Sequence, residues 1–324
     1  YYNTTTGAGI AAVAGLANFF ASPQNGTLKS NNLCDPKVIF DPVAEKFIAF
    51  AQTCDGNSST SQLLLAFSKT SDPTAGWYFY QFSGNQSAAI GQNSWFDYPK
   101  IGVSNSDVFV SGNLFDNNYQ YVQSVVFQIN KTKCYAGAAL AASDALLWYN
   151  MPNSPFTLVP VSNGQLGGYG NNMYILATLQ VGNNTNVAVY EVTNSVNNNP
   201  QLTDQYVNIS NAPPPPDGDQ KGTNYKLDMG DNRGMDGFYL NGTIHYVFHC
   251  SGPGNYGSVS YSRLKKNGAN WAVANNQIIS VPNKDIGFPS VGSFGWTNND
   301  QSALIYFNYS STTDYPGMKA IYAS

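Results

Sequence analysis

Seven charged side chains precede or begin predicted strands in this 324-residue chain, and they are the residues best placed to do chemistry. They are six aspartates and one arginine: Asp35, Asp97, Asp228, Asp231, Arg233, Asp236 and Asp285. Two or three converging carboxyl groups can act as a general acid and a base or nucleophile on a glycoside. Asp35, Asp97, Asp228 and Asp231 are therefore the candidate catalytic residues.

The same aspartates have two other interpretations. Asp228 and Asp231 could contribute to a calcium site, because Ca²⁺ takes six to eight oxygen ligands. Alternatively, an aspartate before a strand caps a turn, as expected for Asp35 in Cys-Asp-Pro and for Asp97 in Phe-Asp-Tyr-Pro. We favour the capping role. No cofactor other than calcium is expected.

The segment LDMGDNRGMDG is the most charge-dense part of the chain. Arg233 lies between Asp231 and Asp236, which predicts a structural ion pair at the entrance of a strand. The alternative is that Arg233 and Asp236 bind a ligand, with the guanidinium orienting an anionic group.

Aromatic residues are abundant, with 22 Tyr, 18 Phe and 5 Trp, and most are expected to pack between strands. Trp95, Trp148 and Tyr169 fall on predicted loops, where they could stack on a sugar ring or on another protein. The two histidines, His245 and His249, share one predicted strand. Four residues of strand separate them by about 13 Å, too far to bind one metal ion, so we expect structural roles.

The elements that position these residues are expected to be short strands. Turn residues recur every 8–12 positions, a pattern that predicts an all-β fold. The strands group in fours, and the first strand of a group recurs about every 60 residues, near positions 37, 99, 156, 234 and 288. Several strands, such as LLLAF and FIAFA, are apolar at consecutive positions, as expected for strands buried on both faces.

This pattern predicts a single β-propeller domain over residues 1–324, built from four-stranded antiparallel blades. Five blades are favoured, with six or seven as alternatives. The last group has three strands, so a strand within the N-terminal segment 1–33, in AVAGLANFF, is expected to close the ring of blades formed by 34–324. A short helix is expected at Ala136–Leu147, and the fourth strand of the second group near KCYAG.

Composition narrows the classes of partner. Only 10% of residues are charged, the net charge is −4, and the two arginines are Arg233 and Arg263. A nucleic-acid partner requires clustered Lys and Arg, so none is expected. No segment approaches the roughly 20 apolar residues of a membrane helix, so no membrane insertion is expected.

Cysteines and glycosylation sequons indicate an extracellular or cell-surface protein. Cys34 and Cys54 bracket a predicted hairpin and are expected to form a disulfide, whereas pairing of Cys134 with Cys250 is left open. The first residue, Tyr1, fits a mature secreted chain. Asn-x-Ser/Thr sequons occur at Asn3, Asn25, Asn57, Asn85, Asn130, Asn183, Asn208, Asn241 and Asn308.

Three stretches resemble the secreted sialidase-like β-propeller proteins: DPKVIFDPVAEKF, SKTSDPTAGWYFY and WFDYPKIGVSNSDVFVSGNLF. Two later ones, DQKGTNYKLDMGDNRGMDGFYLNGTIHYVFH and FPSVGSFGWTNNDQSALIYFNYSSTTDYPGMKAIYA, extend the resemblance nearly to the end of the chain. The resemblance implies architecture more than activity. Sialidases bind the sialic-acid carboxylate with three arginines, and a chain with two cannot supply them.

The sequence therefore favours a non-catalytic extracellular glycoprotein that acts through its surface. It would serve in adhesion, in binding glycans or extracellular proteins, or as a subunit of an assembly that includes copies of itself. The alternative is a carbohydrate-active enzyme, a glycoside hydrolase or polysaccharide lyase, that uses the aspartates at the mouth of the propeller.

Overall fold

The computed structural model describes residues 15–164, 170–178 and 184–324, and these residues form an all-β structure. The chain divides into two compact units, each described separately below. The first comprises residues 1–101 and 106–149, and the second comprises residues 102–105 and 150–324.

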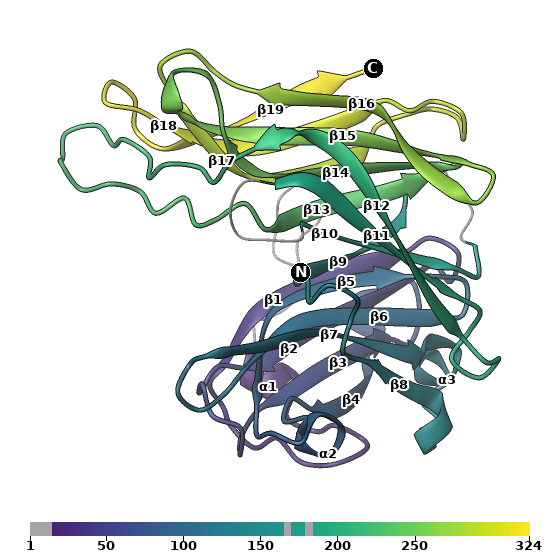
Figure 1. Cartoon of the computed structure of the whole chain (residues 1–324). Helices are drawn as coiled ribbons and strands as arrows, with labels where there is room; N and C mark the ends of the chain where they lie inside the picture. The colour runs from purple at the N-terminus through teal and green to yellow at the C-terminus, as the bar shows by residue number, and fades with distance from the viewer. Residues whose placement is uncertain (1–14, 165–169, 179–183) are drawn as a thin grey trace. The chain divides into compact units, whose positions relative to one another are not determined.

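The first unit contains two four-stranded sheets, each with its strands in chain order (Figure 1). The first sheet consists of β1 (Leu33–Asp41), β2 (Lys46–Thr53), β3 (Gln62–Ser68) and β4 (Trp77–Ser83). The second consists of β5 (Trp95–Val103), β6 (Asp107–Phe115), β7 (Tyr121–Asn130) and β8 (Ala145–Trp148). Short helical turns are α1 (Leu16–Phe19), η1 (Pro73–Ala75), α2 (Ser87–Ile90), α3 (Lys131–Tyr135) and η2 (Ala142–Asp144).

The second unit contains two further groups of four strands and one group of three. The third group is β9 (Phe156–Asn163), β10 (Met173–Thr178), β11 (Asn184–Thr193) and β12 (Gln201–Ala212). The fourth is β13 (Gly234–Leu240), β14 (Thr243–Ser251), β15 (Gly257–Asn267) and β16 (Asn270–Ile279), with η3 (Pro253–Asn255) after β14. A short parallel pairing of β9 with β13 joins them into one eight-stranded sheet, and β17 (Asp285–Ser293), β18 (Ala303–Ser310) and β19 (Gly317–Ala323) form the last sheet.

The grouping of strands predicted from the sequence is confirmed, with three local differences. The fourth strand of the second group is β8, and the predicted strand at KCYAG is mostly the helix α3. The helix expected at Ala136–Leu147 is reduced to the three-residue turn η2. The predicted N-terminal closing strand is wrong where it is described, because Leu16–Phe19 is a helical turn whose apolar side chains pack on the first sheet.

Central strands are apolar on both faces because both faces are covered. All seven residues of β3 are buried, as are eight of the nine residues of β6 and of β14. Burial of each large apolar side chain contributes roughly 1.5–3 kcal/mol, so these strands supply most of the stability of their sheets. In the second unit one core cluster surrounds Tyr246 and Phe248, and another surrounds Tyr261 and Phe307.

The first strand of a group tends to be irregular where it begins. Register shifts interrupt its pairing with the second strand in β1, β9, β13 and β17. Four residues near these starts have left-handed backbone conformations: Asp35 (φ 49°), Tyr98 (φ 57°), Thr157 (φ 61°) and Phe288 (φ 52°). A β-bulge redirects the side chain at its position, so these strand entrances present residues that a regular strand would not.

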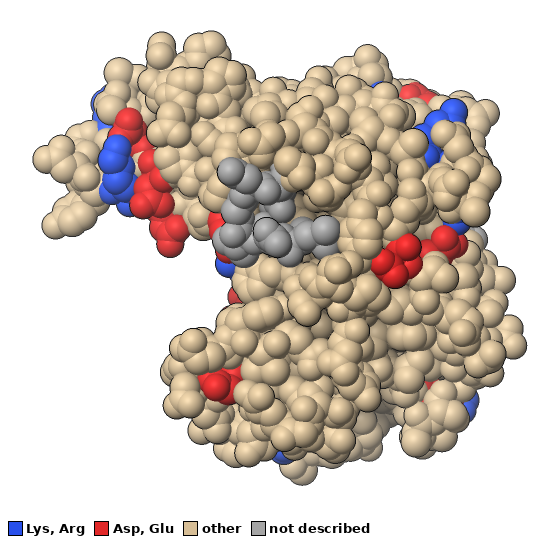
Figure 2. Space-filling model, in the orientation of Figure 1, with Lys and Arg blue, Asp and Glu red and all other residues tan. Residues whose placement is uncertain are grey.

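The surface carries few charges, as Figure 2 shows by its small red and blue areas among uncharged residues. Across the part of the chain that the structure describes, no helix has the length and apolarity needed to span a membrane.

Candidate functional site

The candidate site lies at the start of β1 and β5, where Asp35 and Asp97 contact the side chain of Gln52. Gln52 is on β2, paired with Cys34, and is only 1% exposed. Its Nε2 atom donates hydrogen bonds to Oδ2 of Asp35 at 3.1 Å and to Oδ1 of Asp97 at 2.8 Å. Because both oxygens share one nitrogen, they lie within about 6 Å of each other.

The chain around Asp35 is fixed by a bulge and a disulfide. Asp35 lies in the register shift between Cys34 and Lys37, with φ at 49°. The predicted disulfide between Cys34 and Cys54 is confirmed, and both sulfur atoms lie 3.8 Å from Nε2 of Gln52. A non-glycine residue in this conformation costs about 1–2 kcal/mol, and the crosslinked strand pair holds it in place.

Asp97 is positioned by the residues on either side of it. Its Oδ1 accepts the backbone N–H of Tyr98 at 2.7 Å, and Phe96 is buried with its N–H bonded to Oγ of Ser61 at 2.9 Å. Gly112 on β6 permits this approach, because a Cβ atom there would lie 2.8 Å from the carbonyl oxygen of Asp97 and 2.1 Å from the Phe96 ring. Any larger residue at 112 would displace β5 at the site.

The two carboxyl groups are electrostatically coupled. The pKa of Asp35 is raised above its ordinary value, first by desolvation of its carboxyl group and then by the negative charge of Asp97. Lys37 opposes this with a smaller lowering effect. A carboxyl group with a raised pKa beside a second carboxyl group is an arrangement suited to acid–base catalysis.

Gln52 also carries an unused acceptor. Its Oε1 atom is buried and has no hydrogen-bond partner among the described residues. Buried polar atoms are nearly always bonded, so this oxygen is an unusual feature of the site. The sequence analysis did not select Gln52. The available signal was a polar residue inside the apolar strand KFIAFAQT, two positions before Cys54.

In the second unit Asp231 and Arg233 form an ion pair. The guanidinium donates from Nε and Nη2 to the two carboxylate oxygens of Asp231 at 2.7 and 2.6 Å, and it lies 4.6 Å from the centre of the Phe156 ring. Oδ1 of Asp228 accepts the backbone N–H of Gly230 at 2.7 Å. Asp231 and Arg233 thus have the contacts of a structural ion pair, and Asp228 has the contact of a turn cap.

Asp236 and Asp285 also receive backbone donors. Asp236 accepts the N–H groups of Gly237 and Val291 at 2.9 and 3.1 Å. Asp285 is buried and accepts those of Gly257 and Asp219, both at 2.8 Å. Each carboxylate thus joins two segments of the chain, which is a structural role.

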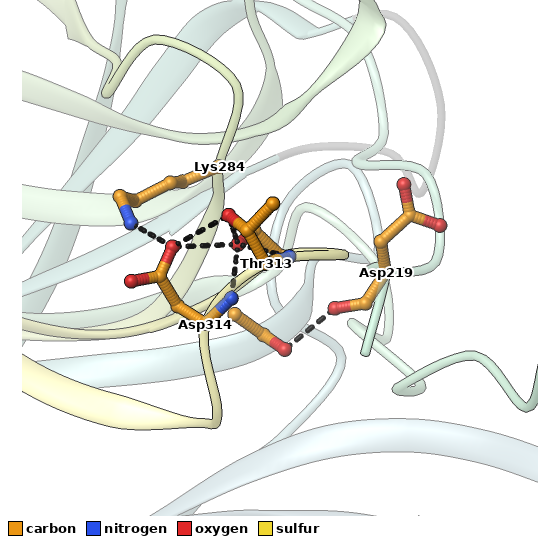
Figure 3. Close-up of polar contacts among 6 residues, drawn as sticks. Asp219, Lys284, Thr313 and Asp314 are labelled. Atoms are coloured by element: carbon orange, nitrogen blue, oxygen red, sulfur yellow. Dashed lines mark hydrogen bonds and ion pairs between the residues drawn. The ribbon is translucent and has the colours of Figure 1, made fainter. Parts of the chain in front are cut away.

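Another polar cluster stabilises the loop after β18, as shown in Figure 3. Oδ2 of Asp314 binds Lys284 and accepts hydrogen bonds from the hydroxyls of Ser311 and Thr313 at 2.8 and 3.0 Å. The ion pair with Lys284, followed by these hydroxyl donors, lowers the pKa of Asp314 to about 2. Oγ of Ser310 donates to the carbonyl oxygen of Asp219, which ties this loop to the segment before β13.

The two histidines are buried in separate surroundings. Nδ1 of His245 is 2.7 Å from the hydroxyl of Tyr261, and its Nε2 is 3.0 Å from Oε1 of Gln301. Nε2 of His249 accepts the backbone N–H of Phe288. Desolvation lowers the pKa of both imidazoles to about 4, so both are neutral near pH 7.

The aromatic candidates are placed differently from the prediction. Trp95 and Trp148 lie on strands, not in loops, and both are partly buried. Their indole N–H groups donate to the carbonyl of Asp116 at 2.8 Å and to Oε1 of Gln128 at 3.0 Å. These are packing contacts. The third candidate, Tyr169, lies outside the described residues.

Cys134 and Cys250 are both buried free thiols, so the disulfide considered between them is not formed. Among the sequons, Asn25, Asn57, Asn208, Asn241 and Asn308 are exposed, and Asn85 and Asn130 are partly buried. Asn3 and Asn183 lie outside the described residues. Glycosylation stays a prediction.

The described residues include no group of three or more His, Cys, Asp or Glu side chains arranged to hold a metal ion. Asp228 and Asp231 are engaged by Gly230 and Arg233, as above. Calcium binding by these two residues stays a prediction.

No family model matches the chain, and no curated protein matches it. Several solved structures do. An endo-arabinase from Bacteroides thetaiotaomicron VPI-5482 is 12% identical, covering 92% of this chain and 96% of its own, with a TM-score of 0.41. A thermostable family-43 glycoside hydrolase is 13% identical, covering 90% and 88%, with a TM-score of 0.39. The catalytic domain of a Coprinopsis cinerea GH62 α-L-arabinofuranosidase is 12% identical, covering 89% of each chain, with a TM-score of 0.37.

These comparisons correct two expectations. The similar structures are described as glycoside hydrolases, and the sialidase-like resemblance is not supported. The matching structures are likewise described as enzymes, which contradicts the expectation of a non-catalytic protein that acts through its surface.

Proposed function

We propose that this chain is a carbohydrate-active enzyme, a glycoside hydrolase whose catalytic carboxyl pair is Asp35 and Asp97. The observation that carries the proposal is the single amide nitrogen of Gln52 that binds both carboxyl groups. Paired carboxyl groups lie about 5–5.5 Å apart in retaining glycosidases and about 6.5–9.5 Å apart in inverting ones, so two carboxyl oxygens on one amide nitrogen fit the retaining arrangement.

The environments of the two groups assign their roles. Asp35, with its raised pKa, is the acid and donates its proton to the glycosidic oxygen as the bond from that oxygen to the anomeric carbon breaks. Asp97, the nucleophile, forms a covalent bond to the anomeric carbon; water then displaces it from that carbon and loses its proton to Asp35. Gln52 holds the two carboxyl groups close together through its Nε2 atom.

A neutral glycan is the substrate class that suits this site. The wider surface has few charges, and the carboxyl pair would repel an anionic polymer. A polysaccharide lyase, the other enzyme considered from the sequence, must neutralise a uronate carboxylate. The basic side chain that acts on Asp35 electrostatically is Lys37. One lysine beside two carboxyl groups does not make the site positively charged, as a uronate would require.

Single substitutions test the proposal. Release of reducing sugars from neutral polysaccharides (arabinan, xylan, galactan and mannan) is measured for wild type, Asp35→Asn and Asp97→Asn. The matched control is Glu45→Gln, an exposed carboxylate in the turn between β1 and β2. Each aspartate variant should lose activity by about 100-fold or more, and the control should keep it. Full activity in either aspartate variant would refute the assignment.

The proposal also covers the architecture of the chain and its location. We infer five blades of one propeller domain over residues 1–324, supported by the five sequential strand groups. An extracellular location is supported by the Cys34–Cys54 disulfide, because such bonds persist in oxidising compartments. Glycans on the exposed sequons would appear as mass above the peptide mass in native material.

A further inference from the structure

A polar cavity of about 250 Å³ opens in the second unit. It is lined by Asn163, Gly170, Asn171, Asn172, Tyr174 and Tyr239. Strand β9 begins at Phe156, beside Arg233, and ends at Asn163 on this cavity. The cavity therefore lies at the end of the strand opposite the Asp231–Arg233 pair.

Two tyrosine rings form its apolar part. The centres of the Tyr174 and Tyr239 rings are 4.8 Å apart, and Trp271 packs edge-on against Tyr174 at 5.0 Å. Tyr174 is 9% exposed, and Tyr239 is more accessible. This stack belongs to the core cluster of the unit, so the ring surface offered to the cavity is rigid.

An ion pair between Lys266 and Glu191 lies next to the Tyr174 ring. Nζ of Lys266 donates to both carboxylate oxygens of Glu191 at 2.9 and 2.8 Å, and Nδ2 of Asn172 donates to the same carboxylate at 2.6 Å. The two charges cancel, so this pair places no net charge next to the lining residues Asn172 and Tyr174. Burial, followed by the charge of Glu191, raises the pKa of Tyr174, which keeps its hydroxyl neutral.

The remaining lining residues are asparagines, whose amides both donate and accept hydrogen bonds. The backbone that carries them is anchored by Asn105, whose N–H donates to the carbonyl of Gly170 at 3.1 Å. The Nδ2 atom of Asn105 donates to Oδ1 of Asn171 at 3.3 Å. Side chains and backbone together make a fixed polar wall facing the tyrosine rings.

We propose that this cavity binds one neutral sugar unit of a glycan. Sugar hydroxyls donate and accept hydrogen bonds, which matches the asparagine amides, and the C–H face of a sugar ring can pack on Tyr239. An anion would find no net positive charge, since Lys266 is paired with Glu191. An apolar ligand would leave the polar wall unsatisfied. The inference does not depend on catalysis by Asp35 and Asp97.

A binding experiment on the full chain tests this site in an Asp35→Asn background, which prevents turnover. The probes are an array of neutral arabino-, xylo-, gluco-, manno- and galacto-oligosaccharides and a matched set that contains uronic acids. Binding to at least one neutral probe is expected, with weaker binding to its acidic counterpart. Tyr239→Ala should weaken it about 10-fold, as loss of an aromatic platform does.

Asn171→Ala, at an exposed position, gives a second variant if Tyr239→Ala fails to fold, and should weaken binding in the same direction. Tyr306→Ala, which removes a 43% exposed tyrosine from β18, is the control and should bind as the background does. No neutral probe bound, or binding unchanged by both cavity variants, would overturn the inference. If binding depends on Tyr239 while the wild-type chain cleaves none of the neutral polysaccharides, the proposed function is overturned and this inference stands.

Discussion

At the residue scale, the amide of Gln52 explains how two carboxyl groups can remain close together. One N–H group to each carboxylate offsets part of their repulsion, and the pKa of Asp35 remains raised. The candidate aspartates could be predicted because each precedes a strand. Gln52 could not, since its contact with them depends on the register of β1 with β2 and on a bulge.

Replacement of Gln52 tests this account. Gln52→Leu removes the shared donor, so the pKa of Asp35 should rise further. Because Asp35 acts as the acid, the alkaline limb of the profile of kcat/KM against pH should move to higher pH. Gln120→Leu, in an exposed loop of the same unit, is the control. An alkaline limb unchanged by Gln52→Leu would show that the amide does not set the pKa of the acid.

The two buried imidazoles predict a loss of stability in acid. Their pKa values are about 4 in the folded chain against 6.5 ordinarily, so between these values the unfolded chain binds protons that the folded chain does not. The free energy of unfolding should therefore fall as pH decreases from 6.5 to 4, by roughly 3 kcal/mol for each imidazole.

Proton NMR can follow both imidazoles because the chain has two histidines. Neither ring should begin to titrate above pH 5, and the midpoint of urea unfolding should fall over the same range as the stability. Titration of either ring near pH 6.5 would contradict the burial described for His245 and His249.

At the element scale, the bulged start of a first strand is what distinguishes the site from ordinary sheet. The alternation and consecutive apolar runs of the sequence predicted most strands closely, including β2, β6 and β7. They could not predict the bulges, because a bulge depends on the pairing of two strands. They also misassigned Leu16–Phe19, whose apolar residues cover a sheet as a helical turn.

The disulfide at the open end of the β1–β2 hairpin should stabilise this element. It joins residues separated by 20 positions, for which the chain-entropy model gives about 3 kcal/mol. The double variant Cys34→Ser/Cys54→Ser should lose that amount in urea unfolding, with an unchanged m-value.

Reductant provides the control for this variant. Dithiothreitol should lower the stability of the wild type to that of the double variant and leave the variant unaffected, because Cys134 and Cys250 are already free thiols. Equal stability of the two proteins without reductant would show that the crosslink is not a stabilising feature of the hairpin.

At the scale of the whole molecule, scarce charge was first taken to favour association through the surface. The carboxyl pair held by Gln52 instead supports the proposed chemistry on a neutral glycan. Composition could exclude a nucleic-acid partner, but it could not separate binding from catalysis. That distinction depends on two residues 62 positions apart, Asp35 and Asp97, which meet only in the fold.

The single-domain proposal predicts one cooperative thermal transition. In differential scanning calorimetry the calorimetric and van't Hoff enthalpies of unfolding should agree if residues 1–324 unfold as one domain. Two resolved transitions would instead mean that the two compact units are independent domains.

The most direct test of the central claim is the ratio of kcat for Asp35→Asn to kcat for Glu45→Gln on the neutral polysaccharide that wild type cleaves fastest. Asp35→Asn removes a carboxyl group at the site, and Glu45→Gln removes one from the turn that joins β1 to β2. A ratio of about 0.01 or lower is predicted. A ratio near one, or no cleavage of any polysaccharide by wild type, would contradict the account.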